Sequence, residues 1–194
     1  MNELLARKMN PKSLSEVVGQ RHLIGSDKIL SNLIKNKRIF SMILYGPPGI
    51  GKTSIATAIV NDLGCNYRFL NATINNKKDF DQVVEEAKML DGLVLIMDEI
   101  HRLNKDKQDL LLPHVESGAI TLIGATTSNP LFAINPAIRS RCHLLEVKAV
   151  TQKGVVLALQ RALQHPNGLN NQYTMAEDAL NIICTHAFVT MYKS

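Results

Sequence analysis

A lysine and a threonine, Lys52 and Thr53, lie near the end of a glycine-rich stretch that reads GPPGIGKTS over residues 46–54. The stretch fits the pattern GxxxxGK[ST], in which consecutive backbone N–H groups cradle a phosphate at the start of a helix. Its two prolines have no N–H group, but every residue from 49 to 53 has one, so the cradle is complete. Lys52 would neutralise the β- and γ-phosphates of a nucleoside triphosphate, and Thr53 would ligate Mg²⁺. The predicted phosphate-binding residues are Gly46, Pro47, Pro48, Gly49, Ile50, Gly51, Lys52, Thr53 and Ser54.

Two adjacent carboxylates, Asp98 and Glu99, follow the apolar run LVLIM at 93–97. If that run is a buried strand, both side chains emerge at the carboxyl edge of a sheet, where α/β proteins bind their ligands. Asp98 is placed to hold the Mg²⁺ shell, and Glu99 to polarise an attacking water for hydrolysis. The alternative for the pair is a loop that caps the next helix. His101 has either a sensing or positioning role or is a surface histidine.

The segment ATTSNP, at 125–130, follows another apolar run and should end at the same edge. A hydroxyl there can bond the γ-phosphate or the attacking water. Thr127 is the candidate, with Thr126 and Asn129 as alternatives. Threonine and asparagine at a strand end are also ordinary turn formers.

The segment NPAIRSRC, at 135–142, carries Arg139 and Arg141 on a short predicted helix. An arginine in this position would complete a neighbouring subunit's site and stabilise the charge of its transition state. Structural salt bridging is the alternative reading of both arginines.

Short apolar runs alternate with helical patterns along the first 150 residues, which predicts a doubly wound α/β fold with a parallel sheet. The helical pattern at 77–90 places Phe80, Val83, Val84 and Ala87 on one face. The helix expected over 104–118 contains Pro113, which should kink or interrupt it. Strands are expected at 40–45, 67–72, 93–97, 119–127 and 143–147, with a helix at 53–64.

The strand signals stop after Ala149, and helical patterns at 151–164 and 176–187 follow. We therefore expect an α/β domain over 1–149 and a partial helical lid over 150–194, with an atypical tail from 188.

The formal charge of +5 is unevenly distributed, because residues 1–40 contain eight Lys/Arg and three Asp/Glu while the remainder contains fourteen of each. This basic arm either contacts a nucleic-acid backbone or is a solvated surface. No apolar run is long enough to span a membrane and no signal peptide is evident, so we expect a cytosolic protein. Its three cysteines, Cys65, Cys142 and Cys184, fit neither a disulfide framework nor a metal site and read as reduced thiols.

Taken together, GPPGIGKT, LVLIMDEIHR, GATTSNP and SRC resemble an AAA+ ATPase of the branch that contains clamp loaders and the Holliday-junction branch-migration motor. Within that branch, ARKMNPKSLSEVVGQRHLIG (6–25) and DEIHRLNKDKQDLLLPHVESG are similar to the replication-associated recombination protein A family, also called MgsA, and to its eukaryotic relative, the Werner-helicase-interacting ATPase. The resemblance covers about residues 6–185.

The resemblance implies a role for each matching position. It makes residues 46–53 the Walker A motif, Asp98 and Glu99 the Walker B pair, Thr127 sensor 1 and Arg141 the arginine finger that acts in trans. The segment EVVGQRHL (16–23) resembles the part that contacts adenine, so the base-pocket candidates are Val17, Val18 and His22. For the valines, core packing is the alternative.

The resemblance also implies ATP and Mg²⁺ as cofactors and a DNA-stimulated ATPase activity at stalled or gapped replication forks. DNA junctions, single-strand-binding protein and further copies of the same chain are the expected partners. A bacterial, nucleoid-associated location in the cytoplasm would follow.

Two departures from the family are visible. Asn10 stands where members have arginine before the proline, and the sequence THAFVTMYKS replaces the turn and arginine-bearing helix of sensor 2. We therefore expect this polypeptide to bind ATP more readily than it hydrolyses it. Two readings compete with the ATPase: a non-hydrolysing, nucleotide-dependent interaction module and a DExH-type helicase. The residues Lys52, Glu99 and Arg141 argue against the first, and GPPG with SRC against the second.

Overall fold

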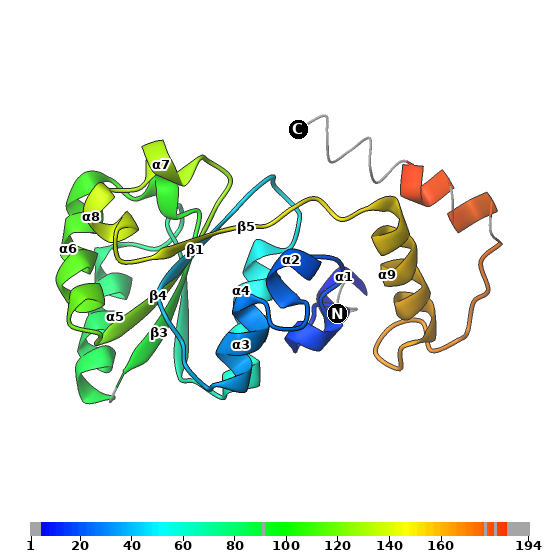
Figure 1. The fold of residues 1–194 in the computed structure, drawn as a ribbon, viewed down its shortest axis with the longest axis horizontal. Coiled ribbons are helices and arrows are strands. Elements are labelled where there is room, and N and C mark those ends of the chain that lie inside the picture. Colours follow the sequence, from blue (N-terminus) through cyan, green and yellow to red (C-terminus); the bar gives the residue numbers. More distant parts are fainter. Residues whose placement is uncertain (1–4, 91, 177, 181, 186–194) are drawn as a thin grey trace.

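A computed structural model describes residues 5–90, 92–176, 178–180 and 182–185, and its central feature is a parallel sheet with helices on both faces (Figure 1). The strand order is β2-β3-β4-β1-β5, and every neighbouring pair is parallel. The strands are β1 (Met42–Tyr45), β2 (Tyr67–Asn71), β3 (Leu93–Asp98), β4 (Ile120–Thr126) and β5 (His143–Glu146).

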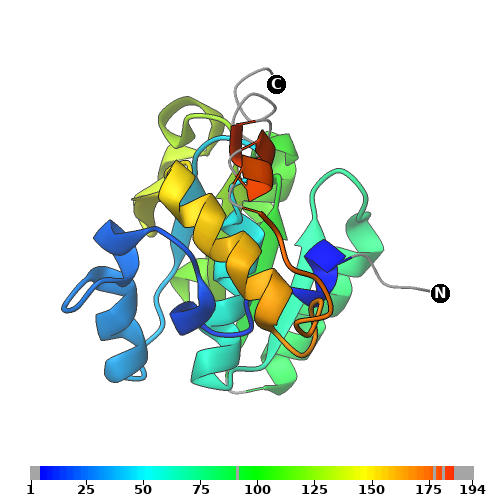
Figure 2. The same cartoon turned by 90° about the vertical axis from the view of Figure 1, so that its right-hand side faces the viewer.

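The helices fall into an N-terminal group, the helices of the sheet faces and a C-terminal helix. The N-terminal group is α1 (Leu5–Lys8), η1 (Leu14–Glu16), α2 (Arg21–Ile24) and α3 (Ile29–Lys35). The sheet region adds α4 (Lys52–Leu63), α5 (Lys77–Met89), η2 (Ile100–Arg102), α6 (Lys105–Glu116), α7 (Pro130–Ala133) and α8 (Pro136–Arg139). Helix α9 (Gln152–Gln164) follows β5 on the side of the N-terminal segment, as Figures 1 and 2 both show.

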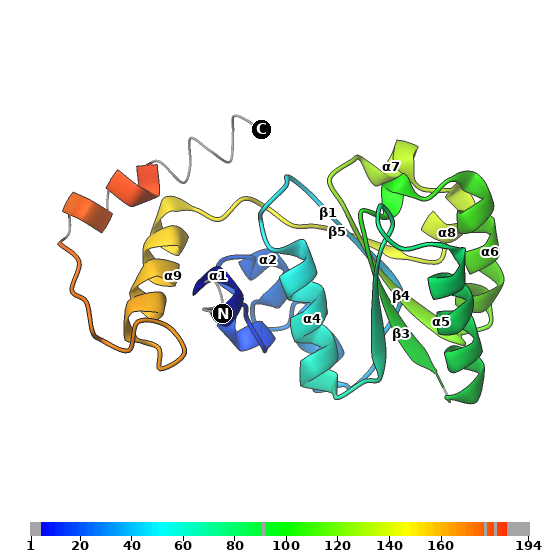
Figure 3. The same cartoon turned by 180° about the vertical axis from the view of Figure 1, so that it is seen from behind.

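Two apolar clusters hold the layers together. Helices α3 and α4 contribute to the cluster on one face, and α5 and α6 to the cluster on the other. In the view from behind, α4 lies on one side of the sheet and α5 and α6 lie on the other (Figure 3). Successive side chains of β1 alternate between them, because strand residues point to opposite faces: Met42 and Leu44 join the first cluster and Ile43 the second. The central strands are therefore apolar on both sides, as expected of a covered parallel sheet.

The predicted α/β class is confirmed, and each predicted strand occurs with bounds shifted by no more than two residues. On α5, Val83 and Ala87 are buried and Phe80 and Val84 pack against the same cluster, so the predicted apolar face is present.

Of the predicted kink or interruption at Pro113, the interruption is wrong, because α6 runs from Lys105 to Glu116 with the proline inside. Proline has no N–H to donate to the carbonyl of Asp109. Both residues lie on the exposed face of α6, where water can satisfy that carbonyl. The helix thus tolerates the missing bond.

Beyond β5, the structure supports the expected helical character without testing the domain division at 149. Of the helix predicted over 176–187, residues 178–180 and 182–185 are helical, whereas residue 176 is not, and the others lie outside the described residues. The tail from 188 lies outside the described residues. Within the part of the chain that the structure describes, no helix is both long and apolar enough to cross a membrane. The thiols of Cys65, Cys142 and Cys184 are free, and burial raises the pKa of Cys142 to about 12.

The N-terminus of α5 provides a test of local stability. The Asn76 side chain accepts hydrogen bonds from the backbone N–H groups of Lys78 (2.8 Å) and Asp79 (3.2 Å), and the Asp79 carboxylate accepts one from the N–H of Asn76 (2.8 Å). Asn76→Ala should lower the free energy of unfolding by about 1 kcal/mol, because two N–H groups lose their acceptor. Urea unfolding of this variant and of the exposed control Gln82→Ala, expected within about 0.5 kcal/mol of the parent, measures the difference. Equal losses in both would contradict the capping role.

Candidate functional site

The glycine-rich loop joins the end of β1 to the start of α4. Gly51 caps α4 with a φ of +90°, and Gly46 has a φ of +148°, so both use backbone regions that side chains disfavour. A Cβ atom on Gly46 would lie 2.2 Å from the carbonyl oxygen of Val147, just beyond β5. The N–H of Gly46 donates to the carbonyl of Thr126 at 3.3 Å. The start of the loop is therefore fixed between the ends of β4 and β5, the two strands that flank β1.

The Lys52 ammonium is buried beneath this loop with 7% of the residue exposed. Its Nζ donates to the carbonyl oxygens of Gly46 (2.8 Å) and Pro47 (2.6 Å). Burial lowers the pKa of Lys52, and the nearby carboxylates of Glu99 and Asp98 act in the opposite direction. The acidic pair thus favours the cationic form of the lysine.

One open cavity of about 330 Å³ brings together residues from three distant segments. The loop and α4 contribute the first part, the end of β3 contributes Asp98 and Glu99, and the end of β4 contributes Thr127. The loop and helix residues that line it are Pro48, Gly49, Gly51, Lys52, Thr53 and Ser54. Of the other predicted loop residues, Gly46 and Pro47 bond Lys52 through their carbonyls, while Ile50 is buried in the apolar core.

Glu99 leaves β3 in an unusual conformation, with a φ of +51°. A non-glycine residue in this left-handed region costs of order 1–3 kcal/mol, which the surrounding structure must offset. Asp98 contributes directly, since its Oδ1 accepts a hydrogen bond from the Glu99 N–H at 3.0 Å. The turn aims the two carboxyl groups of the pair into the cavity.

His101 is the residue whose role the sequence left open, and it contacts Glu99. Its Nε2 lies 3.3 Å from Glu99 Oε2, and its Nδ1 lies 2.9 Å from Thr126 Oγ1. Only 11% of its side chain is exposed, so it is not a surface histidine. The DExH spacing was the available signal, but it does not reveal that a threonine from β4 meets the second ring nitrogen.

The two arginines of the NPAIRSRC segment, Arg139 and Arg141, are absent from the residues that line this cavity. Arg141 forms an ion pair with Glu116 at the end of α6, and it also donates to the carbonyl of Ala137 (2.8 Å) and the hydroxyl of Ser140 (3.0 Å). Arg139 donates to the carbonyl of Leu131. Both arginines are therefore engaged within their own chain.

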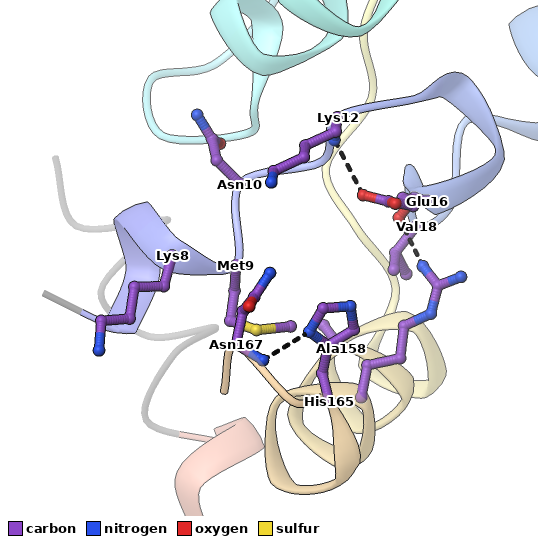
Figure 4. A pocket seen from close by; sticks show the side chains of 10 residues that line it. Lys8, Met9, Asn10, Lys12, Glu16, Val18, Ala158, His165 and Asn167 are labelled. Carbon is purple, nitrogen blue, oxygen red and sulfur yellow. Dashed lines mark hydrogen bonds between the residues drawn. The ribbon is translucent and has the colours of Figure 1, made fainter. Parts of the chain in front are cut away.

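The base-pocket candidates are divided between two cavities. Val18 lines a pocket of about 390 Å³ between the N-terminal segment and α9 (Figure 4). It also lines a second cavity, of about 410 Å³, together with Val17. His22 lines neither of them. Its Nε2 lies 2.8 Å from the carbonyl oxygen of Glu146 and so connects α2 to β5.

A hydrogen bond joins the Figure 4 pocket to the phosphate-loop cavity. The Ser54 hydroxyl, in the phosphate-loop cavity, donates at 2.6 Å to the side chain of Asn10, which lines the Figure 4 pocket. On the opposite wall, Arg161 of α9 donates at 2.6 Å to the carbonyl of Glu16. The linings of the two cavities are therefore in direct contact, and α9 is tied to the N-terminal segment.

Thr53 and Asp98 line one cavity and carry oxygen atoms that could hold a divalent cation. A hydroxyl and a carboxylate suit Mg²⁺, which retains waters and binds phosphate oxygens in addition to one or two carboxylates. In the described residues, no group of three or more His, Cys, Asp or Glu side chains is arranged to hold a metal. The donor set is that of a metal bound together with phosphate.

Comparison with known proteins identifies the fold and the family. Residues 9–156 match the family described as "Holliday junction DNA helicase RuvB P-loop domain". The chain is 51% identical over 174 residues to replication-associated recombination protein A of Bacillus subtilis (strain 168), covering 90% of this chain and 41% of that protein. It is 38% identical to ATPase WRNIP1 of Dictyostelium discoideum, over 91% of this chain and 21% of the relative.

Solved structures lead to the same group. A Thermotoga maritima RuvB mutant superimposes with a TM-score of 0.75 at 27% identity, covering 91% of this chain and 59% of that one. The Thermotoga maritima RuvB "Holliday junction branch migration motor" gives 0.68 at 30% identity, over 81% and 54% of the respective chains. The present chain spans about two fifths of the length of its bacterial relatives. It belongs to the family of RuvB P-loop domains and is an AAA+ P-loop ATPase domain related to replication-associated recombination protein A.

Proposed function

We propose that this domain binds Mg·ATP and hydrolyses it. The observation that carries the proposal is the single cavity that contains the phosphate-loop residues, the Lys52 ammonium, both carboxylates of the acidic pair and Thr127. Amides at a helix N-terminus and a buried ammonium together favour a polyanion such as a triphosphate. To reach it, Lys52 would exchange its two loop carbonyls for phosphate oxygens.

The residues of the cavity divide the remaining chemistry. Thr53 and Asp98 would hold Mg²⁺, which neutralises charge on the phosphate oxygens when bound. Glu99 would accept a proton from the attacking water as the general base, and the Thr127 hydroxyl would hydrogen-bond that water or the γ-phosphate.

We infer that the adenine base of the nucleotide occupies the pocket of Figure 4. The Asn10–Ser54 hydrogen bond supports this, because it places the lining of that pocket next to the lining of the phosphate cavity. Val18 and Ala158 supply apolar surface there. Among the three base-pocket candidates Val18 is the best supported, since Val17 lines the other cavity and His22 bonds a strand carbonyl.

Arg141 would act in trans, on the site of a neighbouring copy in a homo-oligomer. Its absence from the lining of its own cavity supports this assignment. The guanidinium would have to leave Glu116, and that exchange favours binding without efficient turnover in an isolated copy.

In the cell, ATP hydrolysis by this domain would serve DNA maintenance at stalled or gapped replication forks. The names of the relatives, which refer to replication-associated recombination and Holliday junctions, support DNA junctions as the partner. The excess of basic residues over 1–40 suits a phosphate backbone. Single-strand-binding protein, a nucleoid-associated location in the cytoplasm, and the division into an α/β domain (1–149) and a partial lid (150–194) belong to the same proposal.

Two variants separate binding from hydrolysis. Lys52→Ala should weaken Mg·ATP binding roughly tenfold or more, because a charge-assisted bond to phosphate is lost. Glu99→Gln should keep affinity within about twofold while phosphate release falls roughly a hundredfold or more. Calorimetric titration and a phosphate-release assay measure the two quantities. Turnover that Glu99→Gln leaves unchanged would refute the assignment of the base, and ATP binding without turnover in the parent would favour the non-hydrolysing module.

The trans role of Arg141 predicts a dependence on protein concentration. The ATPase rate per subunit should rise with concentration in the parent and stay low in Arg141→Ala, whereas Arg38→Ala, at an exposed site, should follow the parent when DNA is absent. Mixing Arg141→Ala with Glu99→Gln should restore part of the activity, because the second variant donates an arginine to the intact base of the first. A rate per subunit independent of concentration, or no recovery on mixing, would exclude the trans role.

A further inference from the structure

Three side chains form a continuous chain of contacts from the proposed base to the interior of the sheet. Glu99 contacts His101, and His101 contacts Thr126, the last residue of β4, whose Oγ1 also accepts a hydrogen bond from the Ser128 N–H at 3.0 Å. Thr126 is fully buried, while 31% of the Glu99 side chain is exposed. The chain of contacts therefore begins in the buried sheet and ends at the cavity.

The direction of the hydrogen bonds identifies which nitrogen of His101 carries the proton. If Nε2 is protonated, its N–H faces the Glu99 carboxylate, and Nδ1 accepts the hydroxyl proton of Thr126. The opposite neutral tautomer directs a nitrogen lone pair at the carboxylate and leaves the Thr126 hydroxyl only the Ser128 carbonyl, 3.5 Å away. The first arrangement gives every contact one donor and one acceptor.

The position of this chain of contacts connects two parts of the site. Thr126 directly precedes Thr127, and its backbone carbonyl accepts a hydrogen bond from the N–H of Gly46. Glu99 itself lies in the left-handed region, and 31% of its side chain is exposed, so contacts with neighbouring side chains decide how firmly its carboxyl group is oriented. Within the described residues, His101 is the one side chain that contacts this carboxylate at ion-pair distance.

We propose that His101 is a positioning residue that orients the Glu99 carboxylate toward the attacking water. The Thr126 hydroxyl donates to Nδ1 of the ring, which keeps the ring proton on Nε2, where it faces Glu99. The inference rests on the proposed function, because it assigns Glu99 its task as base. Movement at the end of β4, where Thr127 meets the nucleotide, would reach the base through this ring. His101 is not among the residues that line the cavity proposed for the nucleotide.

The tautomer is directly measurable. Long-range ¹H–¹⁵N spectra of the full chain at about pH 8.5, where imidazole rings are neutral, should show His101 in the Nε2–H form, its signals assigned by their loss in His101→Gln. Thr126→Val removes the hydroxyl donor and should shift His101 toward a mixture of tautomers, whereas Thr126→Ser should preserve the parent form. An Nδ1–H tautomer in the parent, or identical spectra for the Val and Ser variants, would overturn the proposal.

If Thr126→Val fails to fold, Glu99→Gln tests the chain of contacts at its other end, where His101 meets the Glu99 carboxylate. Replacing the carboxylate by an amide should shift the Nε2–H proton signal of His101 and leave that of His22, which contacts a backbone carbonyl, unchanged. No shift at His101 would overturn the contact on which the inference depends.

Kinetics then test the consequence for catalysis. His101→Gln should keep the Kd for Mg·ATP within about twofold and lower turnover roughly tenfold or more, since a misplacement of about 1 Å can reduce a rate about a hundredfold. His114→Gln, on α6, is the control for loss of a histidine. Unchanged turnover in His101→Gln would overturn the positioning role. A parent that binds no Mg·ATP would contradict the proposed function instead, and the spectra alone would decide how His101 is held.

Discussion

The burial of one positive charge is the constraint on which this site depends. An ammonium removed from water requires oxygen partners, and Lys52 has two loop carbonyls within 2.8 Å and two carboxylates nearby. The carbonyls belong to residues just after β1, and the carboxylates to the end of β3. The loop carbonyls bond this cation directly and the charges of the acidic pair favour it, although 46 positions separate Lys52 from Asp98 in the sequence.

The parallel sheet makes this meeting possible. Tyr45 pairs with Thr126, and Met97 with Gly124, so the next residues of β1, β3 and β4 emerge at one edge. The residue at or just after the end of each of these strands belongs to the site: Gly46 of the loop follows β1, Asp98 ends β3, and Thr127 follows β4. A shift of one residue in either register would turn the side chains to the opposite faces, and the apolar clusters on both sides of the sheet oppose such a shift.

The meeting of the main site residues could be predicted from short motifs and their order in the sequence. The loop, the acidic pair and Thr127 follow short apolar runs, and strands of a parallel sheet end at a common edge, so their convergence could be inferred from order alone. Pro113 was misjudged because propensity does not report which face of a helix is exposed. The contacts of His101 with Thr126 and of Arg141 with Glu116 depend on elements distant in sequence, and no pattern of spacing contains them.

The close approach of Gly46 to Val147 links the nucleotide loop to the rest of the chain. The gap allows no additional atom between the start of the loop and the carbonyl at the point where the backbone leaves β5 for α9. Helix α9, in turn, holds the carbonyl of Glu16 through Arg161. A displacement of the loop at Gly46 would therefore push against the backbone at Val147, near the root of the segment that carries α9.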